Sequence, residues 1–503
     1  MARKGSSKVK TGCRTCKIRK VKCDEGKPRC QRCISTGRKC DGYVTPASST
    51  SLSWHRPRQL FPNIDDAQER RALEFFIKAA PSLSGPTDPY FWTHLVVQFS
   101  TFEPAVRHSV VAISSLYEQI QNDPDSVHPL VDNRLALGHY NSAIRRLKSM
   151  ENEPLVLLVC VLFVCIEFLL RNREAAISHC NHAVRILENV EACYPWTKEY
   201  LAPIIRRLTM FPFFFTLDGS DFPPLLGLED QIPPSFSSVD EAQYHISGIT
   251  ARTIRLVRWG DVYRLGDMRH KPVSEDLLAE QDTVRSLLSE WNTRFSDLRT
   301  RLPTTVIPDE MLCSILLRYE IACIWVETAF EYSEMVYDKY LDKFRLMVTR
   351  AAELQASKVP KPDTIQKGPK FIFEMGFLPL LYYIVIKCRC LETRIQALSL
   401  MKSLGVAKEN LWETSTMHAA GRKIIELEHD LVLSEKGEIS TSPVWPGLPP
   451  DEMRIRDSST NYELTTEVNE KGQEIRGRLA GFFRRTAEGD IYLQTEFVPQ
   501  TAS

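Results

Sequence analysis

The sequence lacks the common short signatures of catalysis. It contains no G-x-S-x-G nucleophile elbow, no H-E-x-x-H metalloprotease motif and no G-x-x-x-x-G-K-[ST] phosphate loop. The cluster SHCNH at 178–182 is a poor metal site, because on a helix Cys180 points about 100° away from the face that His179 and His182 share. We therefore expect that the chain is not an enzyme.

Long hydrophobic runs are also scarce. The first residues, MARKGSSKVKTG, contain no apolar run and do not resemble a secretory signal. The most apolar stretch, LVLLVCVLFVCIEFLL at 155–170, contains Glu167 and is shorter than the roughly twenty apolar residues that a membrane span needs. We expect a buried core helix there, and a soluble intracellular chain with no membrane partner.

Cysteine is sparse everywhere except in one segment. Six of the 14 cysteines fall in CRTCKIRKVKCDEGKPRCQRCISTGRKC at 13–40, and the other eight are scattered. The segment is an internal repeat, CRTCKIRKVKC followed by CQRCISTGRKC, and each half has the spacing C-x2-C-x6-C. Disulfides are rare inside cells, where clustered thiols usually bind metal.

The spacing indicates zinc. A C-x2-C pair brings two thiolates within reach of one tetrahedral ion, and thiolates in that geometry select zinc. Two zinc ions need eight ligand positions, which six thiolates fill only if two of them bridge both metals. The repeat points to the first cysteine of each half as the bridges, Cys13 and Cys30. The predicted ligands are Cys13, Cys16, Cys23, Cys30, Cys33 and Cys40.

Other readings of the six cysteines stay open from the residues alone. They include a disulfide knot, a redox thiol pair, and a zinc module that binds RNA or protein instead of DNA. The body could also be an enzyme with an accessory zinc domain, although no motif favours this.

Charge is distributed unevenly along the chain. Residues 1–40 contain fourteen Lys or Arg and only Asp24 and Glu25, a formal charge of +12, whereas residues 41–503 carry −11. Two Zn²⁺ and six thiolates sum to −2, so the zinc-loaded segment is still near +10. Such a basic segment is typical of a polyanion-binding domain, whose affinity falls steeply with salt.

The basic run KIRKVK at 17–22 is predicted to form a short helix with Ile18 and Val21 on one face and only basic side chains on the other. A basic helix held by zinc suits the DNA major groove. This stretch resembles the fungal binuclear zinc cluster, the six-cysteine DNA-binding domain of fungal transcription factors, in which the first and fourth cysteines bridge. The resemblance implies that Arg19 and Lys20 read bases, typically a CGG triplet, and that Lys17 and Lys22 contact phosphates.

The rest of the chain is predicted to be mainly α-helical. We expect a zinc cluster domain at 1–45, a Ser-, Thr- and Pro-rich flexible linker at 46–64, and a large helical regulatory domain at 65–503 with a small β-hairpin at 476–499. Helices are expected at 67–80, ending at Pro81, at 103–120, and as a hairpin over 154–188. Further helical segments are expected near 241–266, 274–299, 309–356, 370–397 and 408–433.

The body also carries a family resemblance. RALEFFIKAAPSLSGPTDPYFWTHLV, EPAVRHSVVAISSLYE and VCIEFLLRNREAAISHCNHAVRILE resemble the fungus-specific helical regulatory domain that accompanies this zinc cluster. Together the resemblances imply a nuclear, sequence-specific transcription factor whose partners are double-stranded DNA and the transcription machinery or co-regulators. No three-heptad coiled coil follows the cluster, so both monomeric binding and a homodimer formed through the body stay open.

Overall fold

The chain divides into two compact units, Met1–Asn63 and Ile64–Ser503. The computed structural model describes residues 11–43, 61, 64–122, 133–216, 219–224, 226, 231–303, 306–358, 369–434, 437–445, 447–461, 463–468, 472, 474–486 and 488–499. Most of the predicted linker at 46–64 lies outside these residues, so the division into cluster, linker and body stays a prediction. The fold is mainly helical, as predicted.

The first unit contains two very short helices, α1 (Arg14–Ile18) and α2 (Gln31–Ile34). Its centre consists of the six cysteines, with Val21 and Tyr43 packed against them. Among the described residues of this unit no larger apolar cluster is present, and so few side chains bury too little apolar surface to fold a domain without further help.

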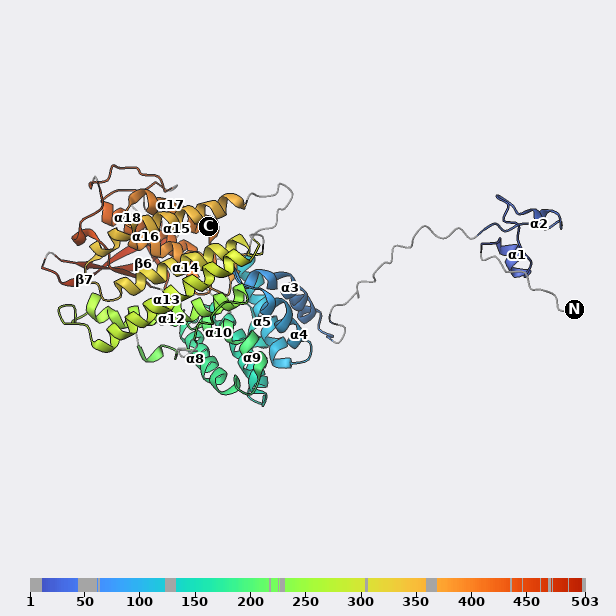
Figure 1. Ribbon diagram of the computed structural model, residues 1–503, viewed down its shortest axis with the longest axis horizontal. Coiled ribbons are helices and arrows are strands. Elements are labelled where there is room, and N and C mark those ends of the chain that lie inside the picture. The colour runs from blue at the N-terminus through green and yellow to red at the C-terminus, as the bar shows by residue number, and fades with distance from the viewer. Residues whose placement is uncertain are drawn as a thin grey trace. The chain divides into compact units, whose positions relative to one another are not determined.

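The second unit, here called the body, begins with a group of packed helices. They are α3 (Ala67–Leu83), α4 (Val96–Ser100), α5 (Pro104–Asn122), α6 (Arg134–Leu147), α7 (Glu153–Leu170), α8 (Arg173–Val190), α9 (Pro195–Tyr200), α10 (Ala202–Leu208) and α11 (Pro212–Phe215). Figure 1 shows the labelled members of this group, in blue to green, lying together. The predicted helices at 103–120 and 154–188 are confirmed as α5 and as the hairpin of α7 and α8.

The prediction that this first helix ends at Pro81 is wrong, because α3 continues to Leu83. Proline lies here in the last turn, where its missing N–H and its clash with the preceding turn disturb only the end of the helix. Leu83 is fully buried, and its packing stabilises the extra residues. Burial of Leu83 therefore outweighs the tendency of Pro81 to end the helix.

Helix α7 is the one described helix that is long and apolar enough to cross a membrane, with a mean hydropathy of 2.6. It is packed against α5 and α8, and 78% of it is buried inside the body. The side chain of Glu167 is buried too and accepts a hydrogen bond from the Tyr140 hydroxyl. These contacts are those of the predicted core helix.

The central and C-terminal helices are more broken than predicted. Helices α12 (Val239–Arg264) and α13 (Glu275–Arg301) match the predicted segments. The segment predicted at 309–356 is instead α14 (Asp309–Thr328), a 3-10 helix (Glu334–Tyr340) and α15 (Leu341–Ser357). The segment at 370–397 opens with strand β1 (Phe371–Ile372) and contains α16 (Leu378–Lys387) and the start of α17 (Leu391–Leu404). The segment at 408–433, predicted as one helix, opens with strands β2 (Lys408–Glu409) and β3 (Trp412–Glu413) and continues as α18 (Thr414–His429).

The predicted C-terminal hairpin is confirmed and belongs to a larger sheet. Strands β6 (Glu474–Arg485) and β7 (Ile491–Pro499) pair antiparallel, with Gly477 opposite Pro499 and Arg485 opposite Ile491. Strands β4 (Asp457–Thr460) and β5 (Thr465–Val468) also pair with β6, which makes four strands. Ala480, Phe482 and Val498 bury one face against α16–α18 and their neighbours, and Figure 1 shows these red and orange elements together.

Candidate metal centre and nucleic-acid interface

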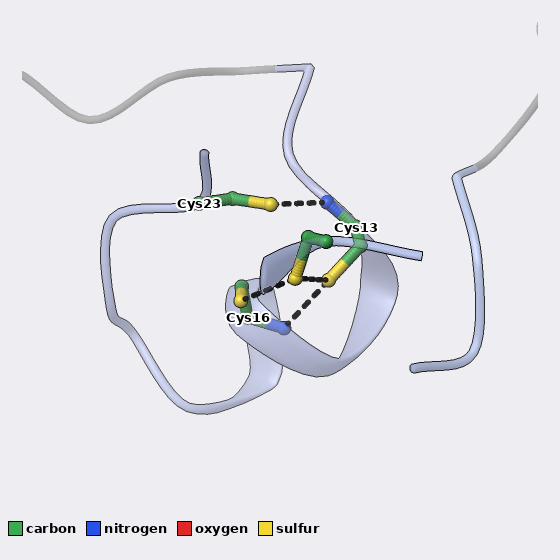
Figure 2. A group of neighbouring side chains, drawn as sticks. Cys13, Cys16 and Cys23 are labelled. Atoms are coloured by element: carbon green, nitrogen blue, oxygen red, sulfur yellow. Dashed lines mark hydrogen bonds between the residues drawn. The ribbon is translucent and has the colours of Figure 1, made fainter. Parts of the chain in front are cut away.

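Each half of the cysteine repeat starts a helix with a thiol. Helix α1 follows Cys13, whose Sγ accepts a hydrogen bond from the backbone N–H of Cys16 at 3.3 Å. Helix α2 follows Cys30, whose Sγ accepts from the N–H of Cys33 at 3.4 Å. Figure 2 shows the first of these contacts and the N–H of Cys13 directed at Cys23. The thiols therefore act as N-caps, the position in which a side-chain acceptor satisfies a free helix N–H.

The six sulfur atoms lie at distances that suit a metal–thiolate cluster. Cys13 Sγ lies 3.6 Å from Cys30 Sγ, Cys16 Sγ lies 3.7 Å from Cys30 Sγ, and Cys13 Sγ lies 3.8 Å from Cys33 Sγ. A tetrahedral zinc with Zn–S bonds of about 2.3 Å places its ligand sulfurs about 3.8 Å apart. A disulfide bond is far shorter, at about 2.05 Å, and all six cysteines are free and buried.

The thiols form two groups of four that share two members. One group contains Cys13, Cys16, Cys23 and Cys30, and the other contains Cys13, Cys30, Cys33 and Cys40. Two tetrahedral ions thus have eight ligand positions among six thiols, with Cys13 and Cys30 counted twice. This arrangement fits two zinc ions bridged by those two residues, as the repeat predicted.

The protonation chemistry of the thiols also fits a metal. Burial raises the pKa of Cys13 to about 12, and burial likewise raises the pKa of Cys16. Burial acts in the same direction on Cys23, but hydrogen bonds from the N–H groups of Cys13 and Glu25 outweigh it and lower its pKa to about 7. Buried thiols with raised pKa values become thiolates only beside a cation, and zinc supplies that charge and couples its binding to folding.

Helices α1 and α2 end in turns of the same type. After α1, the N–H of Lys20 bonds to the carbonyl of Lys17, and the N–H of Val21 bonds to the carbonyl of Cys16. After α2, the N–H of Gly37 bonds to the carbonyl of Ile34, and the N–H of Arg38 bonds to the carbonyl of Cys33. These are Schellman motifs, which require a left-handed residue, and the φ angles of Lys20 and Gly37 are +57° and +61°.

The helix predicted over 17–22 is wrong in its position. Helix α1 covers Arg14–Ile18, and the left-handed conformation of Lys20 ends it before Val21. Ile18 is 71% exposed while Val21 packs on the cysteines, so the two do not share an apolar face. The cause is the thiol cap at Cys13, which starts the helix three residues earlier than the apolar pattern suggested.

The predicted DNA-contacting residues lie on and just beyond α1. Lys17, Lys20 and Lys22 are exposed, and Arg19 is half-buried. The Arg19 guanidinium donates to the hydroxyl of Thr36 at 3.4 Å. All four basic side chains therefore come from the first half of the repeat and from a segment whose backbone the cysteines fix on both sides.

Sequence reasoning missed residues that support this frame. The carboxylate of Asp24 accepts hydrogen bonds from the N–H groups of Gln31 and Arg32, both at 2.9 Å, at the start of α2. The hydroxyl of Thr15 donates to Asp41 at 2.8 Å, and that of Tyr43 donates to the carbonyl of Gly26 at 2.8 Å. Asp24 had been counted only as a negative charge. Its partners lie seven and eight positions away, beyond the reach of any local capping motif.

One further group of possible ligands lies in the body. Glu69, His108 and His139 come from α3, α5 and α6, and the Nδ1 atoms of the two histidines lie 3.0 Å apart. Burial lowers the pKa of His108 to about 4, so the pair is a hydrogen bond between neutral rings. Among the described residues, the SHCNH stretch at 178–182 forms no such group.

Comparison with known proteins places the cysteine segment in a family. Residues 11–49 match the model of the fungal Zn(2)-Cys(6) binuclear cluster domain. The match contains all six cysteines and the basic residues between them.

Several curated fungal proteins are similar to the chain. The Aspercryptin biosynthesis cluster-specific transcription regulator atnN of Emericella nidulans is 29% identical over 57% of this chain and 54% of its own length. Transcription regulator lscL of Purpureocillium lilacinum is 29% identical over 35% of this chain and 48% of its own. The Arginine metabolism regulation protein II of Saccharomyces cerevisiae is 45% identical over 12% of this chain and 6% of its own.

The chain spans about half the length of the first two relatives. The similarity to atnN extends beyond the cluster into the body, because it covers more than half of the chain. No solved structure matches the chain. With its six clustered thiols and its match at 11–49, the chain contains a fungal Zn(2)-Cys(6) binuclear cluster domain, and the relatives named above are transcription regulators.

Proposed function

We propose that the chain is a nuclear transcription regulator that binds double-stranded DNA and reads CGG-like triplets in the major groove. The observation that carries this proposal is the placement of Lys17, Lys20 and Lys22, which stand exposed on a segment tied to buried thiols at both ends. A rigid backbone that presents basic side chains loses little conformational freedom when it binds DNA.

The metal ligands of this proposal are the six cysteines. Zinc, when bound, supplies the folding free energy that the small unit lacks, because this unit has almost no apolar core. The protein residues order the backbone around the metal site: Cys13 and Cys30 cap the two helices, and Asp24 orders the start of α2.

The basic residues divide into two roles in this proposal. Arg19 and Lys20 contact base edges, since bidentate or paired donors to guanine O6 and N7 are the usual means of reading G·C pairs. Lys17 and Lys22 contact phosphates, which positions the domain but carries no sequence information. The body, as a helical regulatory domain, contacts the transcription machinery or co-regulators and has no catalytic role.

A binding selection tests the proposal. The zinc-loaded full chain is presented with a random double-stranded DNA library at about 150 mM salt, where non-specific phosphate binding is weakened. We expect enrichment of a CGG core, and its occurrence singly or as a spaced pair distinguishes a monomer from a homodimer.

The matched control is the same protein treated with a zinc chelator, which should enrich nothing. If the zinc-loaded protein also enriches no sequence, the base-reading role is contradicted. Equal binding to RNA of random sequence would then favour the alternative of an RNA- or protein-binding zinc module.

A further inference from the structure

The body contains a cavity of about 870 Å³ that none of the functional assignments above explains. Its walls come from α8, α11, α12, α14, α16, β3 and β4, which are far apart in the sequence. The side chains that α8 contributes include the exposed Glu174, Ser178 and His182, so the cavity reaches solvent beside this helix. Its volume lies within the ~300–1,000 Å³ range of small-molecule sites.

One wall of the cavity is aromatic. Phe214 lies with its ring 5.5 Å from that of Trp412 and 6.2 Å from that of Trp325, and Phe215 lies 4.8 Å from Trp412. Both tryptophans remain partly accessible although they line an interior space. These phenylalanines belong to the aromatic stretch MFPFFF at 210–215. Met210 and Phe213 are core residues, but Phe213 also lines the cavity together with Phe214 and Phe215.

The cavity also contains hydrogen-bond donors that protein atoms leave unused. Among the described residues, neither the hydroxyl of Tyr383 nor the indole N–H of Trp412 has a hydrogen-bond partner. Leaving a buried donor unsatisfied costs about 1–3 kcal/mol. A ligand with acceptor oxygens would satisfy both donors.

Most of the cations that line the cavity are already paired with protein groups. Lys387 Nζ lies 2.9 Å from a carboxylate oxygen of Glu334. Arg456 pairs with Asp451 at 2.8 Å, and Arg258 pairs with Asp261 at 2.6 Å. These cations therefore leave no strong excess charge for an ionic ligand.

Asp457, on β4, is the remaining acidic group on the same side of the cavity. Burial raises the pKa of its carboxyl, and the nearby carboxylate of Asp261 adds to the rise. Its Oδ1 accepts from the N–H of Ser458 at 2.8 Å. These effects make the Asp457 carboxyl a weaker acid and disfavour a second anion beside it. The cavity chemistry is thus aromatic, donor-bearing and close to neutral.

The geometry points to a binding site for an uncharged, flat, conjugated small molecule that carries carbonyl or phenolic oxygens. Its rings pack against the wall formed by Phe214, Trp325 and Trp412, and its oxygens accept hydrogen bonds from Tyr383 and Trp412. This site does not depend on DNA binding by the zinc domain, because every residue of it belongs to the body.

The test uses Nile red, an uncharged planar dye with a conjugated carbonyl, and the zinc-loaded full chain without DNA. We expect saturable binding of one dye per chain, seen as a rise in fluorescence, and an increase in the melting temperature of the body. Tyr383→Phe removes one donor and keeps the ring. It should weaken dye binding about fivefold, the loss expected for one hydrogen bond, without lowering the melting temperature of the free protein.

A second variant and a control complete the test. Val257→Trp places an indole in the cavity from α12 and should abolish saturable binding while the protein stays folded. Trp259→Phe is the matched control, because Trp259 lies on the same helix, is 39% exposed and does not line the cavity. The proposal is overturned if the dye does not saturate, or if Tyr383→Phe and Val257→Trp bind it as tightly as the control.

Discussion

The two halves of the zinc-cluster domain are built alike. Cysteines and helices recur 17 positions apart, so Cys13 corresponds to Cys30 and α1 to α2. Corresponding residues also meet in space: Cys13 with Cys30, Cys16 with Cys33, and Arg19 with Thr36. The halves are thus related by an approximate two-fold axis that passes near these contacts.

The side chains that the two halves present are different. The predicted DNA-contacting residues Lys17, Arg19, Lys20 and Lys22 correspond in the second half to Ile34, Thr36, Gly37 and Lys39. Only the last pair, Lys22 and Lys39, is basic in both halves. The comparison teaches that the metal-binding frame is duplicated while the predicted DNA-contacting residues belong to one half.

The strongest contrast is at the left-handed turn. The second half uses Gly37, which adopts φ +61° without strain, whereas the first half places Lys20 at φ +57°. A side chain in this conformation costs roughly 1–2 kcal/mol relative to glycine. Strained residues of this kind cluster at functional sites, and this agrees with the proposed base-reading role of Lys20.

Replacing a bridging cysteine should have the largest effect. Cys13→Ala and its counterpart Cys30→Ala should each lower the zinc content from two ions per chain to fewer than one, because each thiolate serves both metals. Cys16→Ala should also unfold the zinc domain. Atomic absorption on purified protein measures the zinc content. Cys388→Ala, in the core of the body, is the control and should keep both ions. A clear difference in zinc content between the two bridging variants would contradict the two-fold relation between the halves.

Replacing basic residues in the two halves should have an intermediate effect. Lys20→Ala should cost roughly 1–3 kcal/mol of discrimination between CGG-containing and scrambled duplexes, with zinc content unchanged. Lys39→Ala should weaken binding to both duplexes by a similar, smaller factor, because a phosphate contact reads no sequence. Titration of each labelled duplex measures both values. An equal loss on both duplexes for Lys20→Ala would contradict its base-reading role.

Exchanging the residues at the left-handed turn should have the smallest effect. Lys20→Gly should stabilise the zinc domain by about 1 kcal/mol, and Gly37→Lys should destabilise it by about as much. No atom lies within 4 Å of a Cβ built at Gly37, so backbone conformation alone sets the cost. The midpoint of zinc release in a chelator titration measures the change. Shifts of the same sign in the two variants would show that the turns are not equivalent.

Much of the zinc domain could be predicted from local spacing. The repeat C-x2-C-x6-C determines which thiols meet, because each pair and each loop is short and closed by the same metal cluster. The hairpin of α7 and α8 and that of β6 and β7 were predictable for a similar reason, since each joins neighbours in sequence. The position of α1 was not, because the thiol of Cys13, read only as a metal ligand, also caps the helix.

By itself, then, the sequence determined the zinc ligands, the basic character of one half of the domain and the helical nature of the body. Each of these depends on composition or on spacings of a few residues. Only the tertiary structure decided that α3 continues past Pro81 and that MFPFFF lines a cavity as well as a core. It also brought Tyr383 and Trp412 to the same space as Asp457. The physical reason is that packing between distant segments outweighs local preference and has no counterpart in the spacing of neighbouring residues.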